Sequence, residues 1–117
     1  MTAETGTREL AHPPCEEIRL ERVLHALADP LRMGIVRDLA AGDELSCSDF
    51  CLPVAKSTVT HHFRVLRENG VIRQVYRGTA KMNVLRRRDL DTLFPGLLDR
   101  ILGAAAAQEA RLGALVR

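Results

Sequence analysis

The chain has 117 residues, of which 46% are hydrophobic and 27% are charged, and its net charge is +2 at pH 7. This length predicts one domain, and this composition excludes a mostly disordered chain. There is no long apolar run, and residues 1–14 lack a basic start and an apolar middle, so we expect neither a membrane span nor a secretory signal. The expected location is cytoplasmic, where the three cysteines would be reduced.

Positive charge is concentrated in residues 56–88. This segment has nine lysines and arginines and one glutamate, a net charge of +8, whereas the rest of the chain has a net charge of −6. Such an asymmetry is typical of a surface that binds a polyanion. The alternative is an ordinary solvated surface, although such surfaces usually mix both signs.

The N-terminal part is expected to be an arm followed by two helices. Residues 1–14 are polar and without period, which predicts a flexible arm, and the folded domain is expected to span residues 15–117. Apolar residues at helical spacing predict a first helix over residues 15–28. Asp29 and Pro30 then form a start signal for a second helix, which ends at Gly42.

The middle of the chain has the pattern of two helices separated by a tight break. Leu45, Phe50 and Leu52 suggest a short helix that cannot continue through Pro53. A second helix is expected over residues 56–69, capped by Ser57 or a neighbour and stopped at Asn69-Gly70. Together these features predict a helix-turn-helix.

After Gly70 the pattern changes to that of a β-hairpin followed by helices. Residues 71–76 are rich in strand formers, residues 77–79 predict a turn, and residues 81–85 predict the return strand. Leucines and isoleucines from residue 90 onward indicate C-terminal helices that restart after Pro95-Gly96. They offer more apolar surface than a small body needs, which suggests a helix–helix dimer.

The adjacent histidines of the middle helix raise the question of a metal site. Neighbouring residues point in different directions from a helix, so His61 and His62 are not expected to chelate one ion. His62 borders the apolar side and is expected to pack at the edge of the core. His61 and Arg64 lie on the opposite side, where they suit the edges of bases in a major groove.

Flanking and hairpin cations are expected to contact the DNA backbone. With about seven phosphate contacts per subunit, affinity would depend steeply on salt. A plain surface turn is the alternative for the hairpin tip. The full set of expected DNA-binding residues is Lys56, Ser57, Thr58, Thr60, His61, Arg64, Arg67, Arg77 and Lys81.

Three stretches, ALADPLRMGIVRDLAAG, AKSTVTHHFRVLRENGVI and VYRGTAKMNVL, resemble the ArsR-type (arsenic-repressor-like, ArsR/SmtB) winged helix-turn-helix transcription regulators. The resemblance covers roughly residues 18–102. It implies a mainly α fold, a winged helix-turn-helix with about five or six helices and a two-stranded β wing. It also implies a homodimeric bacterial repressor that pairs through its first and last helices, and it matches Ser57, Thr60 and His61 to the family's DNA-reading positions.

The same resemblance raises the question of an effector. The family's thiolate motif, Glu-Leu-Cys-x-Cys-Asp, is represented here by ELSCSD, and no histidine follows His62 to form the family's C-terminal metal site. The remaining sensor-thiol candidates are Cys15, Cys47 and Cys51, with His12 as a further ligand. They suit a thiophilic metal or metalloid, or an oxidant, and the alternative is that they pack as small apolar residues. No cofactor is expected to be required for the fold.

These observations favour a DNA-binding transcriptional regulator, a homodimeric repressor of a two-fold symmetric operator on double-stranded DNA. The alternative is a protein-interaction module on a winged-helix scaffold that binds no DNA, for which the +8 segment has no evident use. An enzyme is not expected, because no paired carboxylates, no nucleophile with a base and no glycine-rich phosphate loop can be assembled.

Overall fold

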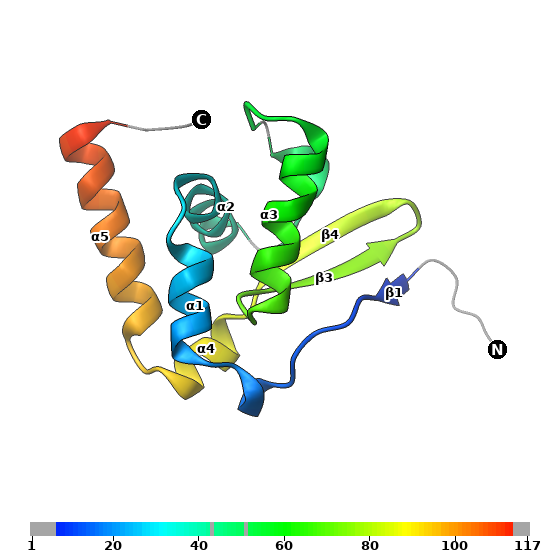
Figure 1. Cartoon of the computed structure of the whole chain (residues 1–117), viewed down its shortest axis with the longest axis horizontal. Helices are drawn as coiled ribbons and strands as arrows, with labels where there is room; N and C mark the ends of the chain where they lie inside the picture. Colours follow the sequence, from blue (N-terminus) through cyan, green and yellow to red (C-terminus); the bar gives the residue numbers. More distant parts are fainter. Residues whose placement is uncertain (1–6, 43, 51, 114–117) are drawn as a thin grey trace.

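The fold is a mainly helical winged helix-turn-helix, as the sequence predicted (Figure 1). The computed structural model describes residues 7–42, 44–50 and 52–113. In chain order the elements are β1 (Thr7–Glu9), the 3-10 turn η1 (Cys15–Glu17), α1 (Leu20–Leu27), α2 (Pro30–Ala41), β2 (Glu44–Ser46), the 3-10 turn η2 (Cys47–Asp49), α3 (Lys56–Glu68), β3 (Ile72–Arg77), β4 (Ala80–Leu85), α4 (Arg87–Leu93) and α5 (Leu97–Leu112).

The first predicted helix is divided in two. The prediction of one helix over residues 15–28 was wrong, because η1 stops after one turn and the chain is extended at Ile18 before α1 begins. In this extended segment Ile18 is buried and packs against Gly70. The start signal of α2 is confirmed, since the Asp29 side chain accepts a 3.0 Å hydrogen bond from the backbone N–H of Leu31.

The segment before α3 differs most from expectation. The short helix predicted around Leu45, Phe50 and Leu52 is absent from the described residues, which form β2 and the single turn η2 instead. The reason is competition from the sheet, because β2 pairs with β4, while Asp49 caps the turn by accepting a 2.7 Å bond from the N–H of Ser46. The tight connection into α3 is nevertheless retained.

Both ends of α3 were predicted, one of them with the wrong cap. The helix begins at Lys56 after Ala55, which has no side-chain hydrogen bond to offer, so the predicted cap at Ser57 was wrong. The end is confirmed: Asn69 is the C-cap, and Gly70 follows with a φ of 83° in the left-handed region.

The predicted hairpin is confirmed as β3 and β4, and it lies inside a larger sheet. The antiparallel sheet has the order β1-β3-β4-β2, so a short strand flanks the hairpin on each side. Thr7 lies opposite Arg77, and Ser46 lies opposite Met82. The hairpin therefore has a partner along each edge for part of its length.

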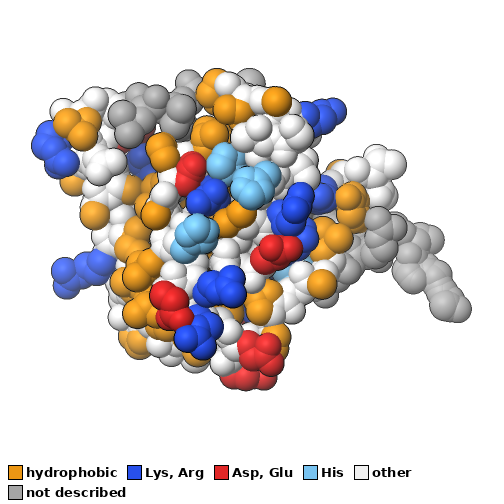
Figure 2. Space-filling model, viewed as in Figure 1, with side chains coloured by type: hydrophobic (Ala, Val, Ile, Leu, Met, Phe, Trp, Pro, Cys, Tyr) orange, Lys and Arg blue, Asp and Glu red, His pale blue; other side chains and the backbone are white. Residues whose placement is uncertain are grey.

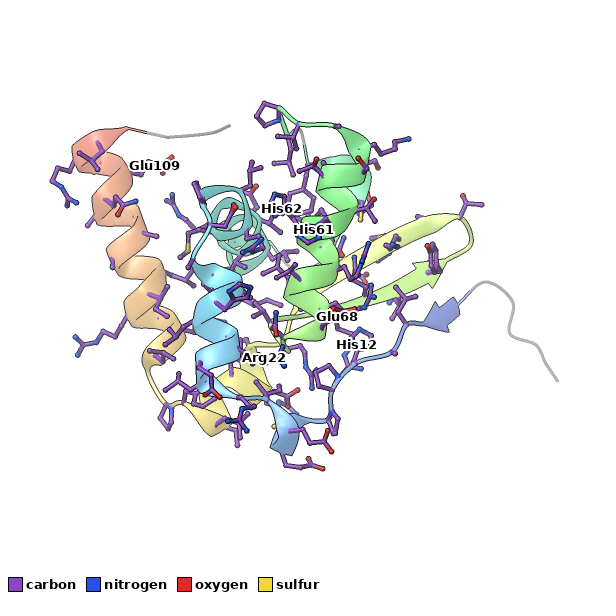
Figure 3. All side chains as sticks on the ribbon, in the orientation of Figure 1. His12, Arg22, His61, His62, Glu68 and Glu109 are labelled. Carbon is purple, nitrogen blue, oxygen red and sulfur yellow. The ribbon has the colours of Figure 1, made fainter. Side chains whose placement is uncertain are left out.

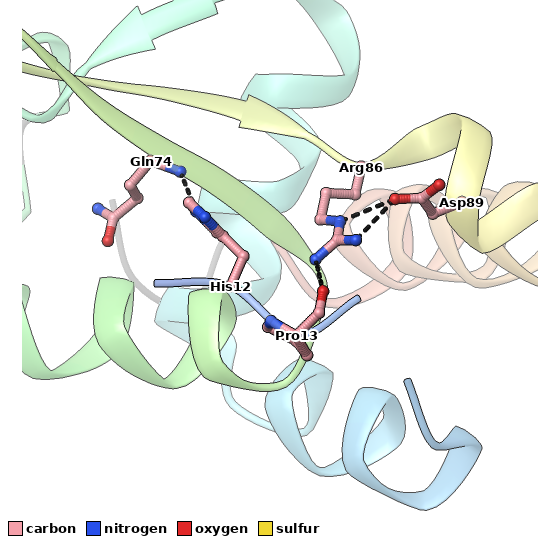
Figure 4. Close-up of polar contacts among 5 residues, drawn as sticks. All are labelled: His12, Pro13, Gln74, Arg86 and Asp89. Carbon is pink, nitrogen blue, oxygen red and sulfur yellow. Dashed lines mark hydrogen bonds and ion pairs between the residues drawn. The ribbon is translucent and has the colours of Figure 1, made fainter. Parts of the chain in front are cut away.

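The strand β1 belongs to the segment that was expected to be a flexible arm, and no strand was predicted there. Further contacts hold the chain that follows it. The backbone N–H of Gln74 donates a 2.9 Å hydrogen bond to Nε2 of His12, and Arg86 donates a 2.8 Å bond to the carbonyl of Pro13 (Figure 4). Residues 7–14 thus lie along the sheet, while the division of the chain at residue 14 stays a prediction.

The core lies between the helices and the inner face of the sheet. Its buried side chains are aliphatic except for Phe63. The partly buried Phe50 packs edge-on against Phe63, at a ring-centroid distance of 5.3 Å. Each large side chain buried in this way stabilises the fold by roughly 1.5–3 kcal/mol. The most deeply buried members include Ile35, Val36, Leu39, Phe63, Leu66, Val71 and Ile72.

The last helix lies at one end of the molecule, beside α1 (Figure 1). Arg37 of α2 and Glu109 of α5 form a 2.6 Å ion pair that links this helix to the body. Leu20 and Leu24 of α1 and Leu112 of α5 are 42%, 44% and 62% exposed. None of the helices among the described residues has the length and apolar character needed to cross a membrane.

Candidate nucleic-acid interface

The leading half of α3 presents its polar side chains to solvent. Lys56, Ser57, Thr60, His61 and Arg64 are all exposed, while the opposite side of the helix is buried in the core. In Figure 3, α3 runs in front of the sheet with His61 and His62 labelled at mid-helix. Within the described part of the chain, the side chains of Lys56, Ser57, Thr60 and Arg64 make no hydrogen bond or ion pair. They are therefore available to an external partner.

The start of α3 suits an anion. The first N–H groups of a helix have no intrahelical acceptor, and Ala55 offers no side-chain acceptor for them. The positive end of the helix dipole adds to the charge of Lys56. This arrangement fits one phosphate at the point where the helix would meet a DNA strand.

His62 has a structural position, as predicted. Its side chain is buried, and its Nδ1 lies 3.0 Å from the guanidinium of Arg32 in α2. Burial lowers the pKa of His62, and the Arg32 charge lowers it further, while Asp29 opposes the shift. The ring is therefore a neutral hydrogen-bond acceptor that fixes α3 against α2. The neighbouring His61 side chain, by contrast, is exposed to solvent.

Arg67 does not point outward as expected. Its Nη1 donates a 2.6 Å hydrogen bond to Oε1 of Gln74 in β3, and its Nε is buried with no partner among the described residues. Thr58 is half-buried. The sequence could not show this, because Gln74 lies on a different element and its side chain decides the direction of the arginine.

The wing cations are close to other side chains of the protein. Arg77 forms a 3.0 Å ion pair with Glu44 of β2, and the Lys81 ammonium lies 5.4 Å from the centroid of the Tyr76 ring. The Arg77 pair is more than half exposed on the arginine side and is worth little in stability. Breaking this pair therefore costs little.

The +8 segment is not one continuous basic face, which corrects the sequence-based interpretation. Arg86 is buried and donates two hydrogen bonds to Asp89, at 2.9 and 2.8 Å (Figure 4). Arg87 pairs with Asp91 and Asp99. Figure 2 shows acidic side chains among the basic ones on the face that carries α1 and α3. Among the cations proposed for DNA contact on α3 and the wing, Lys56, Arg64 and Arg77 are exposed and Lys81 is half-buried. These are fewer cations than the roughly seven phosphate contacts expected per subunit.

Comparison with known proteins agrees with this geometry. A helix-turn-helix domain family matches residues 27–75, which include α2, the following break and the whole of α3. The "Uncharacterized HTH-type transcriptional regulator YceK" of Bacillus subtilis (strain 168) is 33% identical over 90 residues, covering 74% of this chain and 88% of that relative. The chain belongs to the helix-turn-helix transcriptional regulators. It is a DNA-binding regulator.

The sensor-thiol candidates of this helix-turn-helix regulator lie in different places. Cys15 lines a hollow with His12 and Asp89, whereas Cys47 lines a cavity between η2, α3 and the wing. Cys51 lies outside the described residues. Across the residues that are described, no three histidine, cysteine or acidic side chains come together in a way that could hold a metal ion.

The two described thiols differ in their surroundings. Partial burial and the neighbouring Asp89 carboxylate raise the pKa of Cys15, which disfavours a thiolate. The Sγ atom of Cys47 accepts a 3.4 Å hydrogen bond from Nδ2 of Asn83. Asn83 and its neighbour Gln74 are fully buried polar residues that sequence reasoning missed, because a strand pattern alone does not distinguish a buried amide from an exposed one.

Proposed function

We propose that this regulator is a homodimeric repressor of the ArsR type that binds a two-fold symmetric operator. Each protomer inserts the leading half of α3 into the major groove, where His61 and Arg64 read base edges and Ser57 and Thr60 add shorter contacts. The single observation that carries this proposal is the exposure of these side chains with no internal hydrogen-bond or ion-pair partner for Ser57, Thr60 and Arg64 among the described residues.

The wing completes the contact in this proposal. Lys56 at the start of α3 binds one phosphate, and Arg77 and Lys81 bind the backbone beside the groove. In this proposal Thr58 and Arg67 do not contact DNA directly and instead support α3, because Thr58 is half-buried and Arg67 is hydrogen-bonded to Gln74. The three cations per protomer that meet phosphate, Lys56, Arg77 and Lys81, then set the salt dependence.

The dimer pairs α1 and α5 with their copies in a second protomer. Leu20, Leu24 and Leu112 are large apolar side chains that a monomer leaves in water, and all three lie on these two helices. Burying these leucines against a second copy removes the unfavourable free energy of their exposure to water. The two recognition helices would then lie about 34 Å apart, one turn of DNA.

Binding to DNA from upstream of the gene for this protein, measured at several salt concentrations, tests the operator proposal. For six phosphate-binding cations in a dimer we expect log K against log salt to have a slope of about −5, and about half of that for a monomer. Sedimentation of the wild type and of Leu24→Ser tests the dimer. Because Leu24 is exposed in the protomer, the variant is expected to stay folded by circular dichroism and to become monomeric. A wild-type monomer at operator-binding concentrations contradicts this arrangement.

Release from DNA by a thiol-binding metal or metalloid, or by an oxidant, is a separate part of the proposal. Cys47 is the first residue to test, because it borders α3 and the wing, and Cys51 and Cys15 follow. Arsenite is titrated against the reduced protein on its DNA, and bound thiols are counted by mass spectrometry. Release by arsenite in the wild type and its loss in Cys47→Ser support the idea, whereas unreactive thiols in the native protein contradict it.

A further inference from the structure

A cavity of about 660 Å³ lies between the turn η2, the first two turns of α3 and the wing. This volume falls within the range of about 300–1,000 Å³ that is typical of small-molecule sites. No residue of α1 or α5, the helices of the proposed dimer contact, lines this cavity. The cavity adjoins the surface that is proposed to bind DNA. Its lining therefore decides what could occupy it.

The inner wall of the cavity is apolar and aromatic. Phe50 and Phe63 meet there edge to face at 5.3 Å, and Val59 of α3 and Tyr76 of β3 complete the wall. Flat aromatic rings bind well against such a surface through offset or edge-on contacts. An aromatic body is the group that this wall fits best.

The charged part of the lining is positive, and the other polar side chains are neutral hydroxyl groups. Lys56 from α3 and Lys81 from β4 both line the cavity, and no acidic side chain lines it among the described residues. The Lys81 ammonium lies 5.4 Å from the centroid of the Tyr76 ring, so one cation is next to the aromatic wall. Two ammonium groups next to an apolar wall are complementary to a compact anion attached to an aromatic body.

We propose that this cavity binds a small aromatic carboxylate and that such a ligand competes with DNA. This inference rests on the proposed function, because Lys56, Thr60 and Lys81 line the cavity and are also proposed DNA contacts. A carboxylate held between the two ammonium groups takes the charges that would otherwise meet phosphate. The ligand therefore lowers DNA affinity by local competition, without a metal and without the cysteine thiols.

The binding test uses 2-naphthoate and its uncharged analogue 2-naphthamide, titrated into DNA-free protein and followed by ligand fluorescence. We expect 2-naphthoate to bind at least tenfold more tightly than the amide. The variant Lys56→Gln/Lys81→Gln is expected to lose this preference. The matched control, Arg88→Gln/Arg100→Gln, removes the same charge at two exposed positions outside the cavity and is expected to keep it.

The competition test adds 2-naphthoate to the protein–DNA complex. We expect the apparent DNA affinity to fall in the wild type in proportion to the occupied fraction of sites, and not to fall with 2-naphthamide. Equal binding of the two ligands, an unchanged preference in the double lysine variant, or DNA affinity that is indifferent to bound 2-naphthoate would each overturn the proposal. Absence of DNA binding in ligand-free protein overturns the proposed function instead, and the direct titration still decides whether the cavity binds the carboxylate.

Discussion

Arg32 of α2 donates a 3.0 Å hydrogen bond to Nδ1 of His62 in α3, and both side chains are buried. The same guanidinium donates a 2.7 Å bond to the carbonyl of Ala26 at the end of α1. Arginine is always protonated and has no acceptor, so His62 must accept with Nδ1 and hold its proton on Nε2. The Arg32 side chain thereby links α1 and α2 to α3 and helps to fix the position of α3.

This contact predicts a pH dependence of stability. The pKa of His62 in the folded protein is lowered by burial and by Arg32 from its ordinary value of 6.5. At pH values just below 6.5, His62 is therefore protonated in the unfolded chain but still neutral in the folded protein. The free energy of unfolding should therefore fall as the pH falls from 7.5 to 5.5. Urea denaturation across this range should show a smaller fall for His62→Gln, which keeps an acceptor and cannot titrate. Identical pH profiles for the two proteins would contradict the assignment.

Removal of the side chains proposed to read bases should weaken binding without loss of the fold. We expect Arg64→Ala and His61→Ala each to cost about 1–3 kcal/mol of specific binding free energy. Fluorescence anisotropy with labelled operator at one salt concentration measures this. Arg88→Ala, which removes an exposed cation of α4 outside the proposed DNA contact and the proposed dimer helices, is the control and should bind as the wild type does. If neither α3 variant changes the affinity, the proposed reading face is wrong.

The buried amide pair in the wing should be sensitive to substitution. Nε2 of Gln74 donates a 2.8 Å hydrogen bond to Oδ1 of Asn83, whose Nδ2 donates a 3.1 Å bond to the carbonyl of Leu45. Asn83→Leu leaves one buried donor and one acceptor without this partner, which should cost about 1–3 kcal/mol of unfolding free energy. An unchanged urea midpoint would mean that water reaches these groups.

Two glycines with similar backbone angles allow a matched comparison. Gly70 has a φ of 83° and Gly78 a φ of 64°, so alanine is strained at both, by about 1–2 kcal/mol. A Cβ at Gly70 would also lie 2.6 Å from Cγ1 of buried Ile18, whereas a Cβ at Gly78 meets nothing within 4 Å. Thermal unfolding should therefore show a larger loss for Gly70→Ala than for Gly78→Ala, and equal losses would contradict a close contact with Ile18.

Features set by neighbouring residues were predicted well from the sequence. Asp29 with Pro30 starts α2, and Asn69 with Gly70 ends α3, because each signal acts within one turn of helix. The outward placement of His61 and Arg64 follows from the period of the same helix. The fold class could be predicted because most of its elements carry such local signals.

Features set by distant partners were not predicted. The three-residue strands β1 and β2 have no period of their own and exist because the hairpin provides hydrogen-bond partners. For the same reason the sequence could not show that Gln74 holds Arg67, or that Asp89 holds Arg86. Counting charges along the chain therefore exaggerated the basic face.

The pairing of β1 with β3 also protects the protein from self-association of an unwanted kind. An open strand edge offers unpaired N–H and C=O groups to other molecules. β1 covers this edge of β3 opposite Val75, Tyr76 and Arg77, so the outer strand of the described sheet is only three residues long. A shortened chain that starts after Glu9 would make the six-residue strand β3 the outer edge, which is more prone to strand-to-strand aggregation. Such a truncation would produce large particles in a sizing experiment for reasons unrelated to α1 and α5.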